Sequence, residues 1–261
     1  DLMYDSSDES IALVESYLKR MKELVAGWEA DFGKEMMTQE KAWINLMWSG
    51  DAVWAIEEAA AMNVNLDYAV PKEGSVVWFD GWVIPKYAKN VRAARYFINF
   101  MCKPENAVRN MEATGYVSVV GTKETLEAMD YRGPILAKMD KILTEISDCS
   151  DKSQLGELQT RYEELEAELE SIIEESEPVN LSYFFKNSDG NPLVIEYNCG
   201  YTISADSACV DPILYPDHSV IDRCSMMHDS GEQTEKMLEM WSRVKGDNLS
   251  PTMLYGIIAF F

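Results

Sequence analysis

A short aromatic segment carries the side chains with the clearest potential for chemistry. Residues 75–85 read as a β-strand stopped by a proline, and Trp78, Asp80 and Trp82 alternate along it. Alternate side chains of an extended strand share a face, so we expect these three to point the same way. A carboxylate between two indoles is costly to bury alone, whereas an ammonium ligand would pair with it and gain about 0.5–2 kcal/mol from each indole face. The segment therefore predicts a site for an organic cation, and the alternative is that Trp82 is core and Asp80 caps a turn.

Catalysis has much weaker support in the sequence. It contains no Ser/His/Asp order typical of hydrolases, no glycine-rich phosphate loop and no HExxH motif. Asp51 and Asp80 could act as an acid/base pair only in a shared pocket, and their spacing does not indicate one. We predict no catalytic residues and no enzymatic activity.

Cysteine and histidine usage argues against a metal site. The chain has 5 cysteines and 2 histidines, without CxxC or Cys/His ligand spacing. We therefore expect no metal and no other cofactor. Cys199 and Cys209 could form a disulfide if the segment between them is a hairpin.

The charge balance limits the kinds of partner. The chain has 45 acidic and 23 basic residues, a formal net charge of -22. Such a field repels phosphate backbones, so we expect no nucleic-acid binding. It attracts cations from a distance, although most of these residues are expected simply to form an acidic, solvated surface.

The elements that must position the aromatic segment can be predicted from periodicity. Helices are expected at 11–24, 52–62, 88–102, 104–113 and 231–245, and strands at 66–70 and 75–84, with short strand-like pieces within 180–215. Ser6 and Glu9 have the spacing of a capping box before the first helix. Residues 254–261 are apolar and could form a buried strand.

Residues 134–177 have a different character. Apolar residues of the second arm follow a 3-4-3-4-3 spacing: Leu155, Leu158, Tyr162, Leu165, Leu169 and Ile172. With the polar turn at 148–153, this pattern predicts a helical hairpin with a coiled-coil-like seam and a glutamate-rich second arm. We expect it to pack on itself or on the body of the protein, and the alternative is that it recruits a partner.

Several motifs along the chain resemble one known family. Met47-Trp-Ser-Gly-Asp-Ala52, Val70-Pro-Lys-Glu-Gly74, Trp78-Phe-Asp80 and Gly115-Tyr116 follow one another in an order similar to the C-terminal half of the spermidine/putrescine-binding proteins of polyamine ABC transporters. The resemblance is strong over 40–120, moderate over 211–246, weak over 1–39 and absent over 125–205. It implies an α/β fold, a partial two-lobed periplasmic-binding-protein (type II) fold with an inserted acidic helical hairpin.

The resemblance also implies a ligand site. Trp48 and Trp78 would be aromatic walls against a polyamine, Asp80 would pair with an ammonium, and Tyr116 would add a further wall or a hydroxyl contact. Glu9 would be the second acid of a D-x-x-E pair. The sequence departs from the family where Ser6 replaces the first acid and where Met227 replaces an amide, since a thioether barely accepts a hydrogen bond.

The organisation and partners follow from the same resemblance. Residues 1–81 would belong to the second lobe, 82–124 would cross the hinge into the first lobe, 134–177 would be the inserted hairpin, and 178–261 would return to the second lobe and the tail. The expected partners are a polyamine and the permease subunits of an ABC transporter, with membrane contact only through the permease or an upstream anchor.

We expect an extracytoplasmic location, with the signal sequence outside this chain and both ends as truncation points. The remaining alternatives are a binding protein for another cationic solute and a non-binding interaction protein that uses the acidic hairpin.

Overall fold

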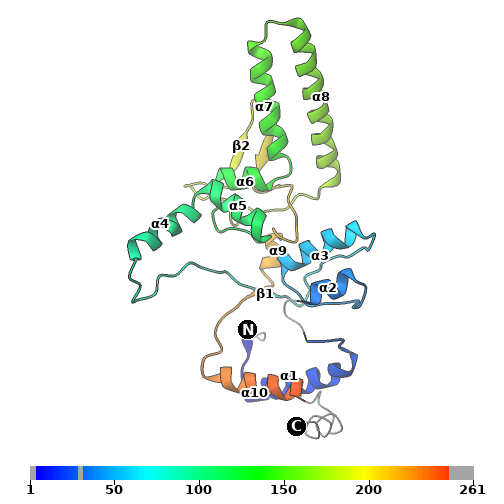
Figure 1. Cartoon of the computed structure of the whole chain (residues 1–261), viewed down its shortest axis with the longest axis vertical. Coiled ribbons are helices and arrows are strands. Elements are labelled where there is room, and N and C mark those ends of the chain that lie inside the picture. The colour runs from blue at the N-terminus through cyan, green and yellow to red at the C-terminus, as the bar shows by residue number, and fades with distance from the viewer. Residues whose placement is uncertain (1–3, 29–31, 247–261) are drawn as a thin grey trace.

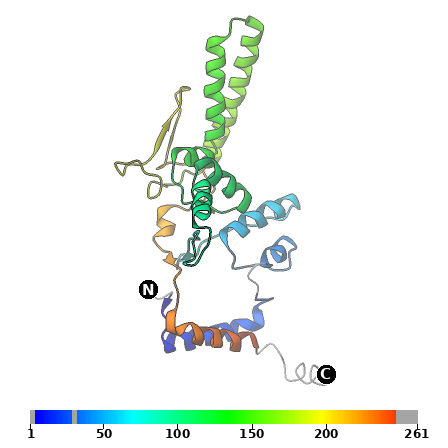
Figure 2. The same cartoon turned by 60° about the vertical axis from the view of Figure 1, so that its left-hand side comes forward.

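The computed structural model describes residues 4–28 and 32–246, and it mixes helices with small sheets. A helical hairpin projects from one end of the long axis, a pair of helices lies at the other end, and the remaining elements lie between them (Figures 1 and 2). The apolar stretch at 254–261 lies outside the described residues. Among the helices that are described, none combines the length and the hydropathy needed to cross a lipid bilayer.

The lower pair of helices joins the two ends of the described chain. Helix α1 (Asp8–Met21), followed by η2 (Lys22–Leu24), packs on α10 (Thr234–Gly246), which η3 (Gly231–Gln233) precedes. Ile11 of α1 is buried against Met240 and Val244 of α10. At the surface of this contact the Arg243 guanidinium donates two hydrogen bonds, of 2.9 and 2.7 Å, to the Glu15 carboxylate.

The start of α1 differs from the predicted capping box. Ser7, not Ser6, is the N-cap, and its hydroxyl accepts the Ser10 amide at 3.3 Å. Asp5 accepts the Ser10 hydroxyl at 2.6 Å, which fixes the turn before the helix. The prediction that Ser6 and Glu9 form the box is therefore wrong, because a neighbouring serine with an acidic support takes the capping role.

The middle of the molecule contains short elements around a very small sheet. Its helices are α2 (Gly33–Thr38), α3 (Ser49–Ala61), α4 (Val91–Met101), α5 (Pro104–Thr114) and α9 (His218–Ile221). The sheet pairs β1 (Val76–Val77) in parallel with β4 (Ser225–Met226). The strand predicted at 66–70 is wrong, since this segment is irregular, and the strand predicted at 75–84 shrinks to two residues. Strand propensity alone cannot form a sheet where neighbouring strands are few.

The upper part has the largest core. We call residues 122–215 the hairpin unit; it contains α6 (Lys123–Met129), α7 (Gly133–Asp148), α8 (Lys152–Glu175) and the antiparallel strands β2 (Val194–Glu196) and β3 (Thr202–Ser204). The predicted helical hairpin is confirmed as α7 and α8. The buried residues of this core are Leu126, Ile135, Leu136, Met139, Leu169, Val179, Leu181, Phe185, Leu193, Ile203, Ala205, Ala208 and Val210.

Buried polar contacts hold the segment after the hairpin onto its helices. The fully buried Asp130 carboxylate accepts two hydrogen bonds from the Arg132 guanidinium, at 2.8 and 2.6 Å, and one from the Cys209 amide at 3.0 Å. Asp140 of α7 accepts the backbone amides of Asn198 and Cys199 at 2.9 and 2.8 Å. The five cysteines are all unpaired, so the disulfide considered for Cys199 and Cys209 is not formed.

Candidate functional site

Three aromatic residues that are far apart in the sequence meet in the middle of the molecule. The Trp48 and Trp78 ring centroids lie 4.7 Å apart at 65°, and those of Trp78 and Tyr116 lie 6.2 Å apart at 69°. Trp48 is the N-cap of α3, Trp78 directly follows β1, and Tyr116 follows the end of α5. We call these three residues the aromatic cluster. Trp48 is 38% exposed, so part of its ring remains accessible.

Two glycines allow this approach. Gly115 ends α5 in the left-handed conformation, with φ 70°, and its amide donates to the Met111 carbonyl at 2.9 Å. Gly50 lies in the first turn of α3, and a Cβ placed there would lie 2.7 Å from Cζ of Tyr116 and 2.8 Å from the Gly115 oxygen. Any side chain at Gly50 would push the Tyr116 ring away from α3.

The small parallel sheet positions Trp78. Val76 and Val77 of β1 pair with Ser225 and Met226, and the Met227 amide continues the ladder by donating to the Val77 carbonyl at 2.8 Å. The Met227 side chain is exposed, and its thioether offers little for an ammonium to bind. This pairing brings β4, which precedes α10 in the sequence, next to β1, which directly precedes Trp78.

Two carboxylates lie near enough to Tyr116 of the aromatic cluster to affect its pKa. Burial of the ring is the largest cause of the raised pKa of Tyr116, and the negative charges of Asp51 and Asp80 raise this pKa further, whereas Lys34 opposes the shift. Asp80 is exposed, and within residues 4–28 and 32–246 nothing forms a hydrogen bond or an ion pair with its carboxylate. The cluster thus has a carboxylate nearby that is free to meet a cation.

A second carboxylate near the cluster already has a partner. Asp51, in the first turn of α3, accepts the Lys34 ammonium of α2 at 2.7 Å, and that ammonium also lies 5.2 Å from the ring centroid of Trp54. The hydrogen bond to Asp51 is the main cause of the raised pKa of Lys34. Sequence reasoning noted Asp51 only as an acid and missed Lys34, because no motif links a lysine to an aspartate in the next helix.

The remaining predicted residues lie elsewhere. Trp82 is 61% exposed, and its ring centroid lies 5.1 Å from that of Phe97 in α4, so it has a partner different from those of Trp78. Glu9 is exposed in the first turn of α1, and α1 packs on α10 at the lower end of the molecule (Figure 1). In the part of the chain that the structure describes, no hydrogen bond, ion pair or ring contact joins Glu9 to the aromatic cluster.

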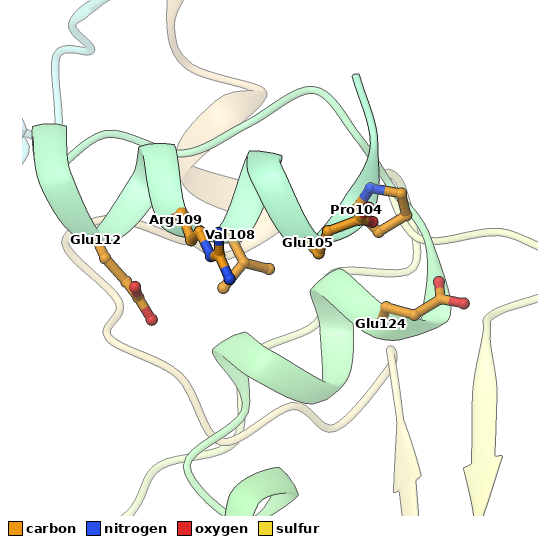
Figure 3. A pocket seen from close by; sticks show the side chains of 6 residues that line it. All are labelled: Pro104, Glu105, Val108, Arg109, Glu112 and Glu124. Carbon is orange, nitrogen blue, oxygen red and sulfur yellow. The ribbon is translucent and has the colours of Figure 1, made fainter. Parts of the chain in front are cut away.

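A separate shallow cleft lies between α5 and α6. Figure 3 shows Glu105, Arg109 and Glu112 along α5, with Glu124 on the facing helix. Pro104 and Val108 complete its lining, so it offers no aromatic face. An aliphatic amine has little to stack on there, which leaves the aromatic cluster as the better cation site.

The comparisons with known proteins agree with this chemistry. Residues 3–127 match the family model of the bacterial extracellular solute-binding proteins. Residues 3–127 are therefore related to that family. The match includes the whole aromatic cluster and Asp80, and it ends close to the start of the hairpin unit.

Curated relatives narrow the resemblance to polyamine binders. The chain is 28% identical over 143 residues to a spermidine/putrescine-binding periplasmic protein of Salmonella typhimurium. The aligned region covers 55% of this chain and 35% of that relative. Its counterpart in Escherichia coli is 30% identical over 99 residues, covering 38% of this chain and 27% of the relative. A putrescine-binding periplasmic protein of Pseudomonas aeruginosa is 43% identical over 60 residues, or 22% and 16% of the two chains.

These relatives confirm the predicted resemblance to polyamine-binding periplasmic proteins. The chain spans about a third of the length of the Salmonella relative and about a quarter of that of the Escherichia coli relative, at 35% and 27%. No solved structure matches the chain at a significant level.

Proposed function

We propose that this chain forms part of the extracytoplasmic solute-binding component of an ABC transporter, which binds a polyamine between two lobes and delivers it to a membrane permease. The observation that carries the proposal is the aromatic cluster of Trp48, Trp78 and Tyr116 beside the unpaired carboxylate of Asp80. Binding, rather than catalysis, is the role named for the relatives.

The chemistry of the cluster suits a protonated aliphatic amine. The methylene groups would lie on the indole faces of Trp48 and Trp78, and an ammonium would pair with Asp80. The raised pKa of Tyr116 keeps its phenol neutral, so its hydroxyl can accept a hydrogen bond from an ammonium without adding a charge. Lobe closure would then remove the ligand from water.

Glu9 remains a proposed contact of the same ligand. Its carboxylate is exposed at the start of α1, and the α1–α10 pair connects to the cluster through β4. Glu9 would reach the ligand only if this pair approached β1, which is a motion of the kind that lobe closure provides.

The organisation into lobes is also a proposal. Residues 1–81 would belong to the second lobe, 82–124 would enter the first lobe, 134–177 would be an inserted hairpin, and 178–261 would return to the second lobe. Helix α4 supports the middle assignment, because it buries no residue and exposes Phe97 and Phe100 by 47% and 52%. The part of a solute-binding fold that this chain does not span would cover that face.

Calorimetry tests the ligand class. A full-length protein that contains this chain should release heat with spermidine or putrescine and not with an amino-acid control, whereas this chain alone should bind weakly because it supplies only part of the cleft. Heat released with another cationic solute, and none with a polyamine, would contradict the polyamine hypothesis and identify that solute as the ligand. Tight, saturable spermidine binding by this chain alone would contradict the proposed division between two lobes.

A substitution tests the role of Asp80. Asp80→Asn should weaken polyamine binding in the full-length protein by about 1.5–3 kcal/mol, the contribution of a hydrogen bond to a charged group. Asp206→Asn, on the exposed surface of the hairpin unit, is the matched control and should leave affinity unchanged. Equal affinities of the wild-type protein and the Asp80 variant would return Asp80 to a structural role.

One observation favours a second function for part of the chain. The hairpin unit lies mostly beyond the family match, which ends at residue 127, and it has a core of its own, while α8 exposes many glutamates to solvent. A partner-binding role for α7 and α8 predicts that deleting 134–177 leaves polyamine binding intact but abolishes a protein–protein contact. Loss of polyamine binding on this deletion, with the rest still folded, would instead make the hairpin part of the solute site.

A further inference from the structure

The Lys34 ammonium occupies the kind of position expected for a ligand ammonium. It forms an ion pair with Asp51 at 2.7 Å and lies 5.2 Å from the Trp54 ring centroid. A carboxylate with an adjacent indole is the same pair of groups that the aromatic cluster and Asp80 offer to a polyamine. The chain therefore holds one of its own ammonium groups in a cation site.

This ion pair lies directly beside the aromatic cluster. Asp51 follows Gly50, the residue whose Cα packs against the Tyr116 ring. The charges of both Asp51 and Lys34 act on the Tyr116 hydroxyl. A ligand stacked on Trp48 and Trp78 would thus have two carboxylates within its surroundings, of which only Asp80 is free.

Helix α2 and its packing hold Lys34 in this position. It is the second residue of the short helix α2, which packs on α3. At Gly33 the backbone lies against the Asn45 side chain so closely that a Cβ would overlap it, which fixes the start of α2 beside the segment leading into Trp48. The Lys34 and Asp51 side chains keep 26% and 21% exposure, so solvent or a ligand can reach them.

We propose that Lys34 is a specificity-determining residue that competes, as a tethered ammonium, with a ligand ammonium for Asp51. The inference rests on the proposed function only for the identity of the natural ligand. A tethered group acts at an effective concentration in the millimolar range, and it lowers the apparent affinity for a free competitor by the fraction of time it occupies the site. Lys34 thereby limits the number of ligand ammonium groups that can bind in this part of the chain.

The first experiment removes the tethered ammonium and supplies one from solution. Lys34→Ala should gain saturable binding of n-propylammonium, seen as a shift of the Trp54 indole N–H signal in NMR, at least about tenfold tighter than in the wild type. Lys41→Ala, a substitution of an exposed lysine just after α2, is the matched control and should behave as the wild type. Sodium at equal ionic strength should not produce the shift, and tetramethylammonium should produce a weaker one, because it can lie on the Trp54 face but donates no hydrogen bond to Asp51.

The Asp51 carboxylate must be the group that receives the probe. Adding Asp51→Asn to Lys34→Ala should abolish the n-propylammonium response. A response that survives in this double variant, or one that sodium reproduces, would overturn the proposal and leave the Lys34–Asp51 pair as a tie between α2 and α3.

A second measurement avoids dependence on a foldable variant. In the wild-type chain, millimolar n-propylammonium should increase the rate of Lys34 acetylation relative to Lys41, because the probe displaces Lys34 from Asp51. An unchanged ratio would contradict competition. Neither measurement uses a polyamine or Asp80, so the proposal can fail while polyamine binding stands, and polyamine binding can fail while Lys34 still competes for Asp51.

Discussion

The hairpin unit and the region around the aromatic cluster differ in where they place their large apolar side chains. The hairpin unit buries leucines, isoleucines, methionine and phenylalanine completely. The site region, which we define as residues 32–120, buries mainly small residues, such as Gly50, Ala52, Ala55 and Ala59 of α3. Its aromatic residues are largely exposed, and Trp43, Ile44 and Leu46 before α3 are almost fully so.

The difference runs against the family relationship. Over its described residues, 4–28 and 32–121, the region related to the solute-binding proteins has only a small core, whereas the hairpin unit, which lies mostly beyond the family match, has a large one. A site whose walls are partly exposed depends on other groups, such as a second lobe or a ligand, to complete its packing. The hairpin unit is expected to carry its own stability, and the site region to have little.

The strongest test of this contrast is a truncation in the hairpin core. Phe185 is fully buried, so Phe185→Ala should lower the free energy of unfolding by about 3–5 kcal/mol. Phe97→Ala in the exposed face of α4 is the control and should cost under about 1 kcal/mol. Urea denaturation followed by circular dichroism measures both, and equal losses would remove the contrast between the two regions.

A buried charge sharpens the same contrast. Asp130→Asn leaves the Arg132 guanidinium without its bidentate carboxylate and should destabilise the hairpin unit by about 3 kcal/mol. The exposed Lys141–Glu145 pair of α7, at 3.9 Å, gives the comparison, and Glu145→Gln should change stability by about 0.5 kcal/mol or less. Similar unfolding midpoints for the two variants would show that the Asp130 network is not important for stability.

Glycine substitutions should have opposite signs in the two regions. Gly50→Ala places a methyl group 2.7 Å from the Tyr116 ring and should cost about 1–3 kcal/mol while moving Tyr116 away from Trp78. Gly156→Ala in α8 meets nothing within 4 Å and should stabilise its helix by about 0.5–1 kcal/mol. Thermal unfolding and tryptophan fluorescence report these effects, and a stabilising Gly50→Ala would show that Tyr116 does not pack on α3.

The smallest expected effect concerns pH at the α1–α10 contact. The Arg243 guanidinium, and then Lys19, lower the pKa of Glu15 from 4.5 to about 2. A lowered carboxyl pKa contributes stability above the unfolded value, and this contribution is lost as pH falls through the folded value, here between about 4.5 and 2.

Carboxyl NMR of Glu15 and fluorescence of Trp28, whose ring centroid lies 5.1 Å from that of Trp241, should both follow this window. Glu15→Gln should remove the fluorescence change while leaving the hairpin unit unaffected. A titration of Glu15 near 4.5 would contradict the ion pair with Arg243.

Local patterns were sufficient for the longer helices, whereas the short helices α2, α6 and α9 were not predicted. The 3-4 spacing from Leu155 to Ile172 predicted α8, because an amphipathic helix records its own buried face in its sequence. The helix predicted at 104–113 is confirmed as α5, which begins at Pro104. The residue types around Trp78 and Asp80 also led to the proposed cation site, because indoles and a carboxylate favour an organic cation.

Only the tertiary structure decided which of these residues meet. The pairing with β4 ends at Val77, so the segment after it is not held in a strand. As a result Trp78 and Trp82 do not share a face: Trp78 contacts Trp48, whereas Trp82 contacts Phe97. The close approach of Tyr116 to Gly50, and the ion pair of Lys34 with Asp51, join separate helices through packing that no local pattern encodes. The sequence alone determined the longer helices and led to the proposed class of ligand, because both depend on nearby residues, whereas long-range packing decided the geometry of the site.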